Sequence, residues 1–447
     1  MDRQTLQANS VYTRHLQDMV RFPTVSTEND GATDWEPFDG FRSFLEKTYP
    51  LLHRNMQRVM IGHGSLLFHW QAEHALKKPV LFMAHQDVVP AGEERKWIYP
   101  PFSGQLANGC VWGRGSVDCK AMLLFLMEAA EELFREGFRP CFDFYIALGH
   151  NEEVFAAKDI KGSALTAAYL QERGVELGCL FDEGGKVERG AAVSLGEKAA
   201  TDIVLYADGT GGHAARPGKG TVLGLIGKAI AAVEENPMPY RLLPMVKAQL
   251  QAGAVNYAGE KQKIFSDPET YWPQVCASAK EDSQLDALLH TTFAVTMAKG
   301  SDRSNVVPSH AEAVVNARLL PGDTAEQVLL HLKNILPAGV NIRISRNAPV
   351  FAPVTPFDTV EFRLLKTAIH EVYGTDTQIV PSLLTGATDS RYYGGICRNI
   401  FRFSGRYHTP AFGDIHRENE KVPENVLPIG VAFFKTFLKK YQEEMDL

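Results

Sequence analysis

The chain has 447 residues, which is too long for one compact core and predicts two or three domains. Its 45% hydrophobic and 22% charged residues are typical of a globular protein, and no apolar run reaches the ~18 residues that a membrane span needs. The net charge of −7 argues against nucleic acid or an anionic membrane as the main partner.

The first 196 residues alternate between helical and apolar extended patterns. We expect helices at about 1–22, 37–48, 120–135 and 162–173, and strands near 55–61, 65–71, 79–84 and 141–149. Three apolar strands lead directly into histidine or acidic residues, after positions 84, 149 and 181. This order predicts an α/β fold with a mostly parallel sheet sandwiched by helices, and a site at the C-terminal edge of the strands.

The pattern changes after residue 196. Residues 199–208 alternate like a half-exposed strand, a helix is expected at 221–235, and strands at 293–298 and 311–319. A helix at 358–373 and a strand at 377–380 then resume the first pattern. We therefore predict a catalytic domain in two parts, 1–196 and 349–447, and a smaller inserted α+β domain at 197–348.

Polar side chains gather where the apolar strands end. His85 and Asp87 are two residues apart after the strand at 79–84, so they can face the same side, with Asp87 orienting the ring of His85. Further carboxylates follow at helix or strand ends: Asp118, Glu152, Glu153 and Asp182. Each has an ordinary alternative as a helix cap, a solvated turn or an Asx turn. Together they would repel one another, and no matching set of lysines or arginines stands beside them, so a divalent metal is the simplest neutraliser.

Several motifs then match one family in order. His85-x-Asp87-Val-Val-Pro, Gly113-Arg-Gly-x-x-Asp118-x-Lys120, Glu152-Glu153 and Asp182-Glu-Gly-Gly resemble the M20 family of dinuclear metallopeptidases, in its branch of carboxypeptidase S and N-acyl-amino-acid hydrolases. Gly212-His213-x-x-x-Pro217, Ser304-Asn305-Val-Val-Pro308, Thr388-Asp389-Ser-Arg391 and His416-x-x-Asn419-Glu420 extend the resemblance over nearly the whole chain.

The resemblance implies a role for each matching residue. Asp118 would bridge two metal ions, and the peptide bond after it would be cis. His85 and Asp182 would be the other ligands of one ion. Glu153 and His416 would be those of the second ion, with His408 as the alternative to His416. Glu152 would be the general base for a water that bridges the metals. Cys119 departs from the family, where a small acid is common, and we do not count it as a ligand.

The inserted domain would serve the substrate. By resemblance, His213 stabilises the oxyanion, from the same subunit or from the partner of a homodimer formed through this domain. Asn305 and Arg391 would bind the terminal carboxylate of the substrate, since a guanidinium matches a carboxylate with two hydrogen bonds.

The sequence thus predicts a metal-dependent hydrolase that cleaves a peptide or amide bond next to a free carboxylate, as carboxypeptidases and dipeptidases do. An aminoacylase-type N-acyl-amino-acid amidohydrolase is the main alternative, and a non-catalytic metal-binding relative is another. Two divalent ions are expected, with zinc favoured and Mn²⁺ or Co²⁺ also suited to the ligands. The six scattered cysteines and the absence of a signal peptide pattern predict a cytoplasmic protein.

Overall fold

A computed structural model describes residues 3–154, 160–345 and 349–444. The chain divides into two compact units. Unit 1 comprises Met1–Leu195, Pro353–Ser382 and Thr388–Leu447, and unit 2 comprises Gly196–Ala352 and Leu383–Ala387. The predicted start of the first helix, at residues 1–2, and the predicted boundary at 348 lie outside the described residues.

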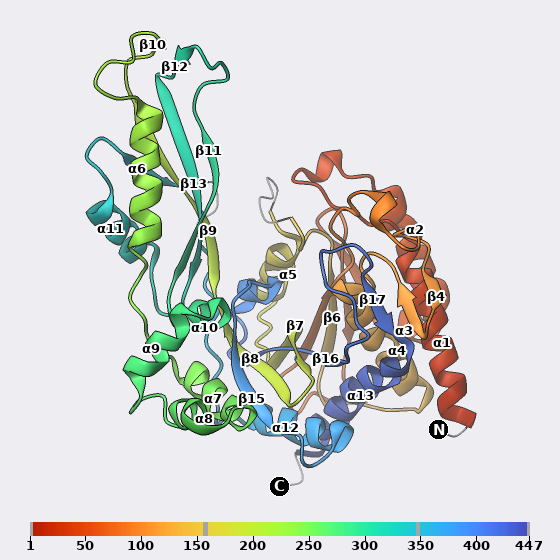
Figure 1. The fold of residues 1–447 in the computed structure, drawn as a ribbon. Coiled ribbons are helices and arrows are strands. Elements are labelled where there is room, and N and C mark those ends of the chain that lie inside the picture. Colours follow the sequence, from red (N-terminus) through yellow and green to blue (C-terminus); the bar gives the residue numbers. More distant parts are fainter. Residues whose placement is uncertain (1–2, 155–159, 346–348, 445–447) are drawn as a thin grey trace. The chain divides into compact units, whose positions relative to one another are not determined.

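The described part of unit 1 is built on an eight-stranded sheet (Figure 1). Its centre, β6, β3, β7 and β16, is parallel, whereas β1, β2 and β8 join it in antiparallel fashion. The prediction of an α/β fold with a mostly parallel sheet is therefore confirmed. In spatial order the strands are β1 (Gln57–Ile61), β2 (Ser65–Trp70), β6 (Phe144–Gly149), β3 (Val80–His85), β7 (Cys179–Val187), β16 (Ile400–Tyr407), β8 (Ala191–Glu197) and β15 (Ile379–Leu384).

Both faces of the central strands are covered, because alternate side chains enter two different hydrophobic clusters. On β3, Phe82 and Ala84 belong to the larger cluster, while Leu81 and Met83 belong to the smaller one. The larger cluster is shared with α1 (Arg3–Val20), α2 (Glu36–Thr48), α3 (Pro50–Asn55), α4 (Ala121–Arg135), α12 (Val360–Tyr373) and α13 (Leu427–Glu443). The smaller cluster is closed by α5 (Gly162–Glu172) and the 3₁₀ segment η5 (Asp389–Tyr393).

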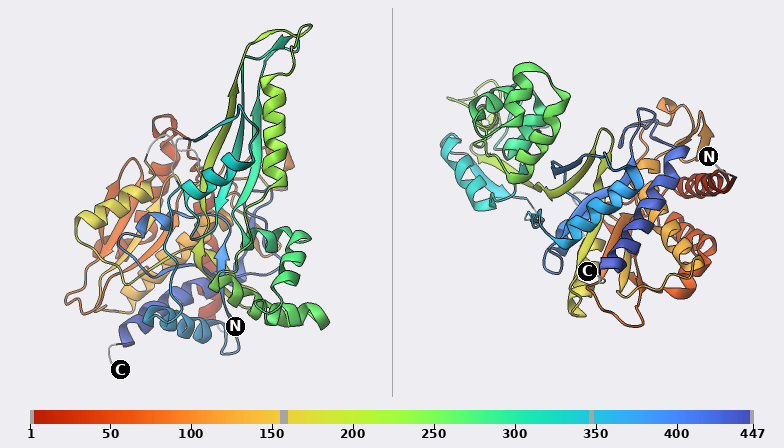
Figure 2. Two further views of the ribbon diagram at one scale, coloured as in Figure 1. Left: turned by 90° about the vertical axis from the view of Figure 1, so that its left-hand side faces the viewer. Right: turned by 90° about the horizontal axis from the view of Figure 1, so that it is seen from below.

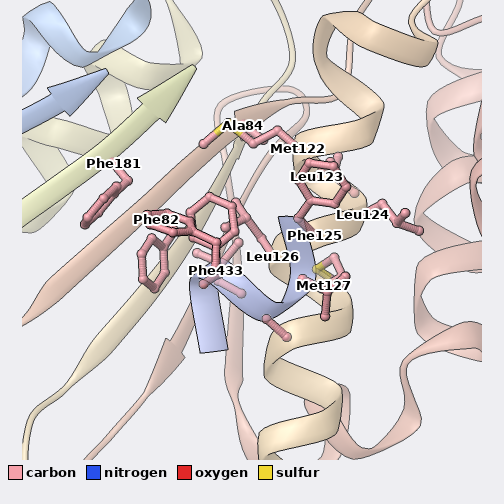
Figure 3. Close-up of a cluster of buried hydrophobic side chains, with 14 of the residues drawn as sticks. Phe82, Ala84, Met122, Leu123, Leu124, Phe125, Leu126, Met127, Phe181 and Phe433 are labelled. Carbon is pink, nitrogen blue, oxygen red and sulfur yellow. The ribbon is translucent and has the colours of Figure 1, made fainter. Parts of the chain in front are cut away.

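Helix α4 lies at the middle of the larger cluster. Figure 3 shows its Met122 beside Ala84 of β3 and its Leu126 near Phe82 of the same strand, with Phe433 of α13 close by. Helices α12 and α13 also contact each other, and Figure 2 shows them together from below. Gly137, at φ +75°, ends the α4 segment with backbone bonds back to the last turn, as the sequence predicts.

A small three-stranded sheet brings the C-terminal part of unit 1 to the segment before α4. It is made of β4 (Gln105–Ala107), β5 (Cys110–Trp112) and β17 (Lys421–Pro423), in the order β17–β5–β4. The antiparallel register sets Lys421 opposite Trp112. Residues after β5 and residues before β17 are therefore neighbours.

Unit 2 contains a four-stranded antiparallel sheet in the order β11–β13–β9–β14, with a cluster shared by α6 and α11 on it. Its elements are β9 (Ala199–Asp208), β10 (Gly212–His213), α6 (Val222–Glu235), α7 (Pro244–Gly253), α8 (Gly259–Ser266), α9 (Trp272–Lys280), α10 (Ser283–Leu289), β11 (Thr292–Lys299), β12 (Val306–Val307), β13 (His310–Leu319), α11 (Ala325–Ile335) and β14 (Asn341–Ile344). Among the described residues of both units, no helix combines the length and apolar character of a membrane span.

Candidate metal centre

Asp118 lies between two histidines that come from distant parts of the chain. It belongs to η3 (Ser116–Lys120), the segment before α4. Its Oδ1 is 2.9 Å from Nε2 of His85, at the end of β3, and its Oδ2 is 3.2 Å from Nε2 of His416. The Asp118–Cys119 peptide bond is cis, as the resemblance implies.

His416 also approaches Glu153, at 3.1 Å between Nε2 and Oε2. Its backbone has φ +61°, in a loop that leads to β17. The ring therefore faces two buried acids although half of its side chain, 52%, is exposed. His408 is not part of either group of metal-ligating atoms in the described residues.

Glu183, and not Asp182, completes the group around His85. Oε2 of Glu183 is 3.7 Å from Nε2 of His85. The carboxylate of Asp182 instead accepts the backbone N–H of Ser390 at 2.8 Å and that of Glu183 at 2.9 Å. The structure thus does not bring Asp182 to the place that the resemblance implies for it.

The alternation of β7 explains this difference. Neighbouring side chains of a strand point to opposite faces, so only one of Asp182 and Glu183 can turn toward η3. Asp182 shares a face of β7 with Leu180, and η5 covers that face. Glu183 shares the other face with Phe181, and η3 and α4 pack there. The two-residue spacing of Phe181 and Glu183 predicts from the sequence alone that the two side chains share a face. The sequence does not tell which face of the strand meets η3.

Asp87 links the end of β3 to the segment that carries both glutamates. Its two carboxylate oxygens accept the backbone N–H groups of Glu152, at 3.1 Å, and Glu153, at 3.0 Å. Nδ1 of His85 is 2.9 Å from the backbone oxygen of Asp87 and 3.4 Å from its carboxylate. Burial by itself raises the pKa of Asp87, but the hydrogen bond with His85, together with the charges of His85 and Lys161, lowers it on balance.

Glu152 belongs to neither group of potential ligands. Its backbone oxygen accepts a bond from Nζ of the buried Lys161, at 2.7 Å, which gives the segment a second anchor besides Asp87. Burial, reinforced by the charge of Asp389, raises the pKa of Glu152 to about 8.

The other buried acids are crowded together. Burial and the nearby charge of Asp118 raise the pKa of Glu183 well above its usual value, and burial also raises that of Glu153. Asp118 differs, since burial would raise its pKa but hydrogen bonds with His416 and His85 bring it down. Cations at this place would stabilise all three carboxylates in their charged form.

The donor atoms suit divalent metal ions. In one group they belong to His85, Asp118, Cys119 and Glu183, and in the other to Asp118, Glu153 and His416; within each group they lie within 4.8 Å of one another. In the described part of the chain, Oε1 of Glu153 is buried without a hydrogen-bond partner. Imidazole and carboxylate are ordinary ligands of zinc. Burial raises the pKa of the Cys119 thiol, which disfavours the thiolate that a metal would need.

The sequence-predicted substrate residues lie in two different places. Arg391 is in η5, where it donates to Thr388 O and to the hydroxyl of Tyr392 and stands 3.8 Å from Asp389. In unit 2, β10 pairs with β12, and Asn305 O accepts the N–H of Ala214 at 3.0 Å. The segments of His213 and Asn305 are therefore neighbours within that unit.

Comparison with known proteins agrees with this arrangement. Residues 81–440 match the model of peptidase family M20/M25/M40. The mouse N-fatty-acyl-amino acid synthase/hydrolase PM20D1 is 31% identical over 95% of this chain and 86% of its own length. Carboxypeptidase S of Saccharomyces cerevisiae is 28% identical over 96% of this chain and 84% of its own. The crystal structure of an M20 family metallo-carboxypeptidase from Sulfolobus solfataricus has the same fold, with a TM-score of 0.69 and 19% identity over 99% of this chain and all of that one. The chain therefore belongs to peptidase family M20/M25/M40, as an enzyme of the metal-dependent hydrolase class.

Proposed function

We propose that the protein hydrolyses a peptide or amide bond next to a free carboxylate, with two divalent metal ions that share Asp118. The observation that supports this is the position of the Asp118 carboxylate, one oxygen beside His85 and the other beside His416. His85 and Glu183 would be the other ligands of one ion, and Glu153 and His416 would be those of the second ion. Glu183 takes the place first expected for Asp182, for the geometric reason given above.

The charges of this set are suited to hydrolysis. Asp118, Glu153 and Glu183 supply three negative charges, against the four positive charges of two divalent ions. When bound, the metal ions would polarise the scissile carbonyl and lower the pKa of water. Glu152 would accept the proton of the attacking water, because it is kept outside both ligand groups and so retains a free oxygen. Asp87 would hold Glu152 and Glu153 in register with His85 through its three contacts.

The remaining parts of the proposal concern substrate and assembly. Arg391 and Asn305 would bind the substrate carboxylate, and His213 would stabilise the oxyanion. The protein would form a homodimer through the inserted domain and work in the cytoplasm, where its six free cysteines stay reduced. Zinc is the proposed metal.

A second candidate substrate class deserves equal testing, because the mouse relative is named for N-fatty-acyl-amino acids and the yeast relative is a carboxypeptidase. The same ligands and base would cleave an N-acyl amino acid, with only the pocket for the acyl group changed. The two candidates therefore differ in specificity and not in chemistry.

The experiment is a substrate panel with the zinc-loaded protein. It contains dipeptides, N-acetyl amino acids and N-fatty-acyl amino acids, each with a free and an amidated C-terminus. We expect cleavage of at least one free acid and loss of cleavage for its amide. If the protein binds two ions but cleaves no member, the proposal of a hydrolase for these substrates is wrong; equal rates on acids and amides would remove the carboxylate requirement.

A further inference from the structure

Glu420 is a fully buried carboxylate that the mechanism above does not use. It stands immediately before β17 and four residues after His416. Its side chain reaches across to the segment between β5 and α4, which carries Asp118. It therefore connects the two segments that supply one pair of candidate ligands.

Four donors surround this carboxylate. Oε2 accepts from Nη1 of Arg114 at 2.8 Å and from the backbone N–H of Gly115 at 2.9 Å. Oε1 accepts from the backbone N–H of Val117 at 2.7 Å and from that of Asp118 at 3.1 Å. The backbone oxygen of Glu420 also accepts the N–H of Gly113, at 2.9 Å. One residue thus orders the backbone from 113 to 118.

The backbone of this segment has an unusual shape, which is also held by bonds from Arg114 N–H to Pro101 O at 2.8 Å and from Ser116 N–H to Gly113 O at 3.1 Å. Gly113 and Gly115 have φ +149° and +80°, which other residues rarely adopt. A Cβ on Gly115 would lie 2.3 Å from Cγ1 of Val88, so the backbone passes close to the end of β3. The N–H groups of 115, 117 and 118 point inward to one place, and a buried N–H without an acceptor is costly. Glu420 is the acceptor for all three.

The loop of His416 is held by the two neighbours of Glu420 in the chain. Asn419 accepts the N–H of Ile98 at 2.7 Å, and Gly413 donates to Lys421 O at 3.0 Å. Because β17 is paired with β5, the end of this loop is fixed on the segment that Glu420 orders. The backbone of Asp118 and the end of the His416 loop are therefore both attached to the segment around Glu420.

We propose that Glu420 is a positioning residue, which sets Asp118 and His416 for metal binding by accepting the N–H groups of residues 115, 117 and 118. This inference rests on the proposed dinuclear site. Glu420 is in neither group of potential metal ligands that the described residues form. Its effect passes through the backbone of Asp118.

The test compares E420Q, E420D and the control E418Q, using Co²⁺ as the probe. Glu418 is in the same loop, but its side chain is exposed at 38%. The amide of E420Q removes the charge opposite Arg114 and puts an NH₂ group against two N–H donors. The measurements are the dissociation constants of both ions by chelator competition, the visible spectrum of bound Co²⁺, and the circular dichroism spectrum as a check of folding.

We expect E420Q to bind at least one ion about 10–100-fold more weakly, the range found for outer partners of metal ligands, and to show a changed Co²⁺ spectrum. E420D, which keeps a carboxylate, should recover part of the affinity, and E418Q should match the unchanged protein. Folded E420Q with the unchanged dissociation constants and spectrum would overturn the inference. If E420Q does not fold, the test relies on E420D, whose carboxylate is one carbon farther from its donors. Unchanged dissociation constants and an unchanged Co²⁺ spectrum in E420D would then overturn the inference.

The two proposals fail in different ways. If the unchanged protein binds no Co²⁺ and cleaves no substrate of the panel, the proposed function fails. If it binds two ions and cleaves a substrate while E420Q and E420D bind Co²⁺ identically to it, only the role of Glu420 fails.

Discussion

Asp87 holds the backbone of Glu152 by a hydrogen bond of 3.1 Å from N–H to Oδ1. The candidate base is therefore fixed to the strand end that carries His85, and not only to its own loop. The substitution D87N would set an NH₂ group against one of the two N–H donors of residues 152 and 153. We expect kcat to fall about 10–100-fold, with weaker metal binding, because both glutamates lose their common anchor.

A matched control for D87N exists in the same unit. Asp143 also pairs with a histidine, His69 at 2.7 Å, and accepts a backbone N–H, from Ala72 at 2.9 Å. D143N should lower the melting temperature of the protein without changing kcat. Equal losses of kcat in both variants would mean that D87N acts only through general stability.

The base assignment is tested by E152Q. The variant keeps the shape of the side chain but cannot take a proton, so kcat should fall about 10²–10⁴-fold, the usual share of a general base. Metal content, measured by plasma mass spectrometry after dialysis, should stay at the level of the unchanged protein. A variant with normal activity would refute the role of Glu152, and one that loses metal would make it a ligand.

The neighbours Asp182 and Glu183 give a sharp comparison. E183Q removes a charge from the group around His85 and should weaken the binding of one ion about 10–100-fold. D182N disturbs the contact with Ser390 and should lower stability while both ions stay bound. Chelator competition and thermal unfolding of the two variants separate these effects. The opposite result, with metal lost in D182N alone, would restore Asp182 as the ligand.

Lys198 predicts a dependence of stability on pH within unit 2. It is fully buried, Nζ donates to Thr292 at 3.2 Å, and burial lowers the pKa of Lys198 to about 8. Below pH 8 it is charged in both states, and the folded state bears the cost of burying that charge. Between about pH 8 and the usual lysine pKa of about 10.4, the folded state releases the proton first, so the free energy of unfolding rises with pH.

The substitution K198M removes this rise. The difference in the free energy of unfolding between the unchanged protein and K198M should shift by up to about 3 kcal/mol over that interval, in favour of the unchanged protein at high pH. Urea unfolding at several pH values measures it. K228M, which alters an exposed lysine of α6, should show no such shift. A constant difference for K198M would contradict the lowered pKa.

Much of unit 1 could be predicted because its strands and helices have strong patterns. Strand β3 and helix α4 are both nearly fully buried, and both were expected within a residue or two of their observed bounds. Asp118 could be found because it lies just before α4, and Glu153 because it comes soon after the buried strand β6. His416 follows no periodic element, so only the order of family motifs pointed to it.

The sequence pattern does not show which of Asp182 and Glu183 faces the candidate metal centre. Strand β7 is buried on both faces, with Leu180 and Phe181 both at 0% exposure, so no alternation of polar and apolar residues marks its two sides. The face of Phe181 is set by contacts with α13, such as the 4.5 Å between the rings of Phe181 and Phe437. Such contacts join residues more than 200 positions apart, so the local sequence around either residue does not indicate them.

Short elements were missed for a related reason. The three-residue strands β5 and β17 are too short to show any period, although their pairing brings Glu420 to Asp118. Helices α7 to α10 of unit 2 have ten residues or fewer and were not predicted. These helices pack against one another around Met245 and Val275, and this packing, which a local sequence pattern does not reveal, stabilises them.

The division of unit 1 in the sequence has a consequence for biosynthesis. His85, Asp118, Glu153 and Glu183 all precede unit 2, whereas His416 follows it. A nascent polypeptide that has emerged only as far as unit 2 would hold all three proposed ligands of one cation but only two of those proposed for the other. On the proposed ligand assignment, the second cation gains its histidine only after unit 2 has been translated, so a product truncated within unit 2 would hold the full ligand set of one cation and an incomplete set for the other.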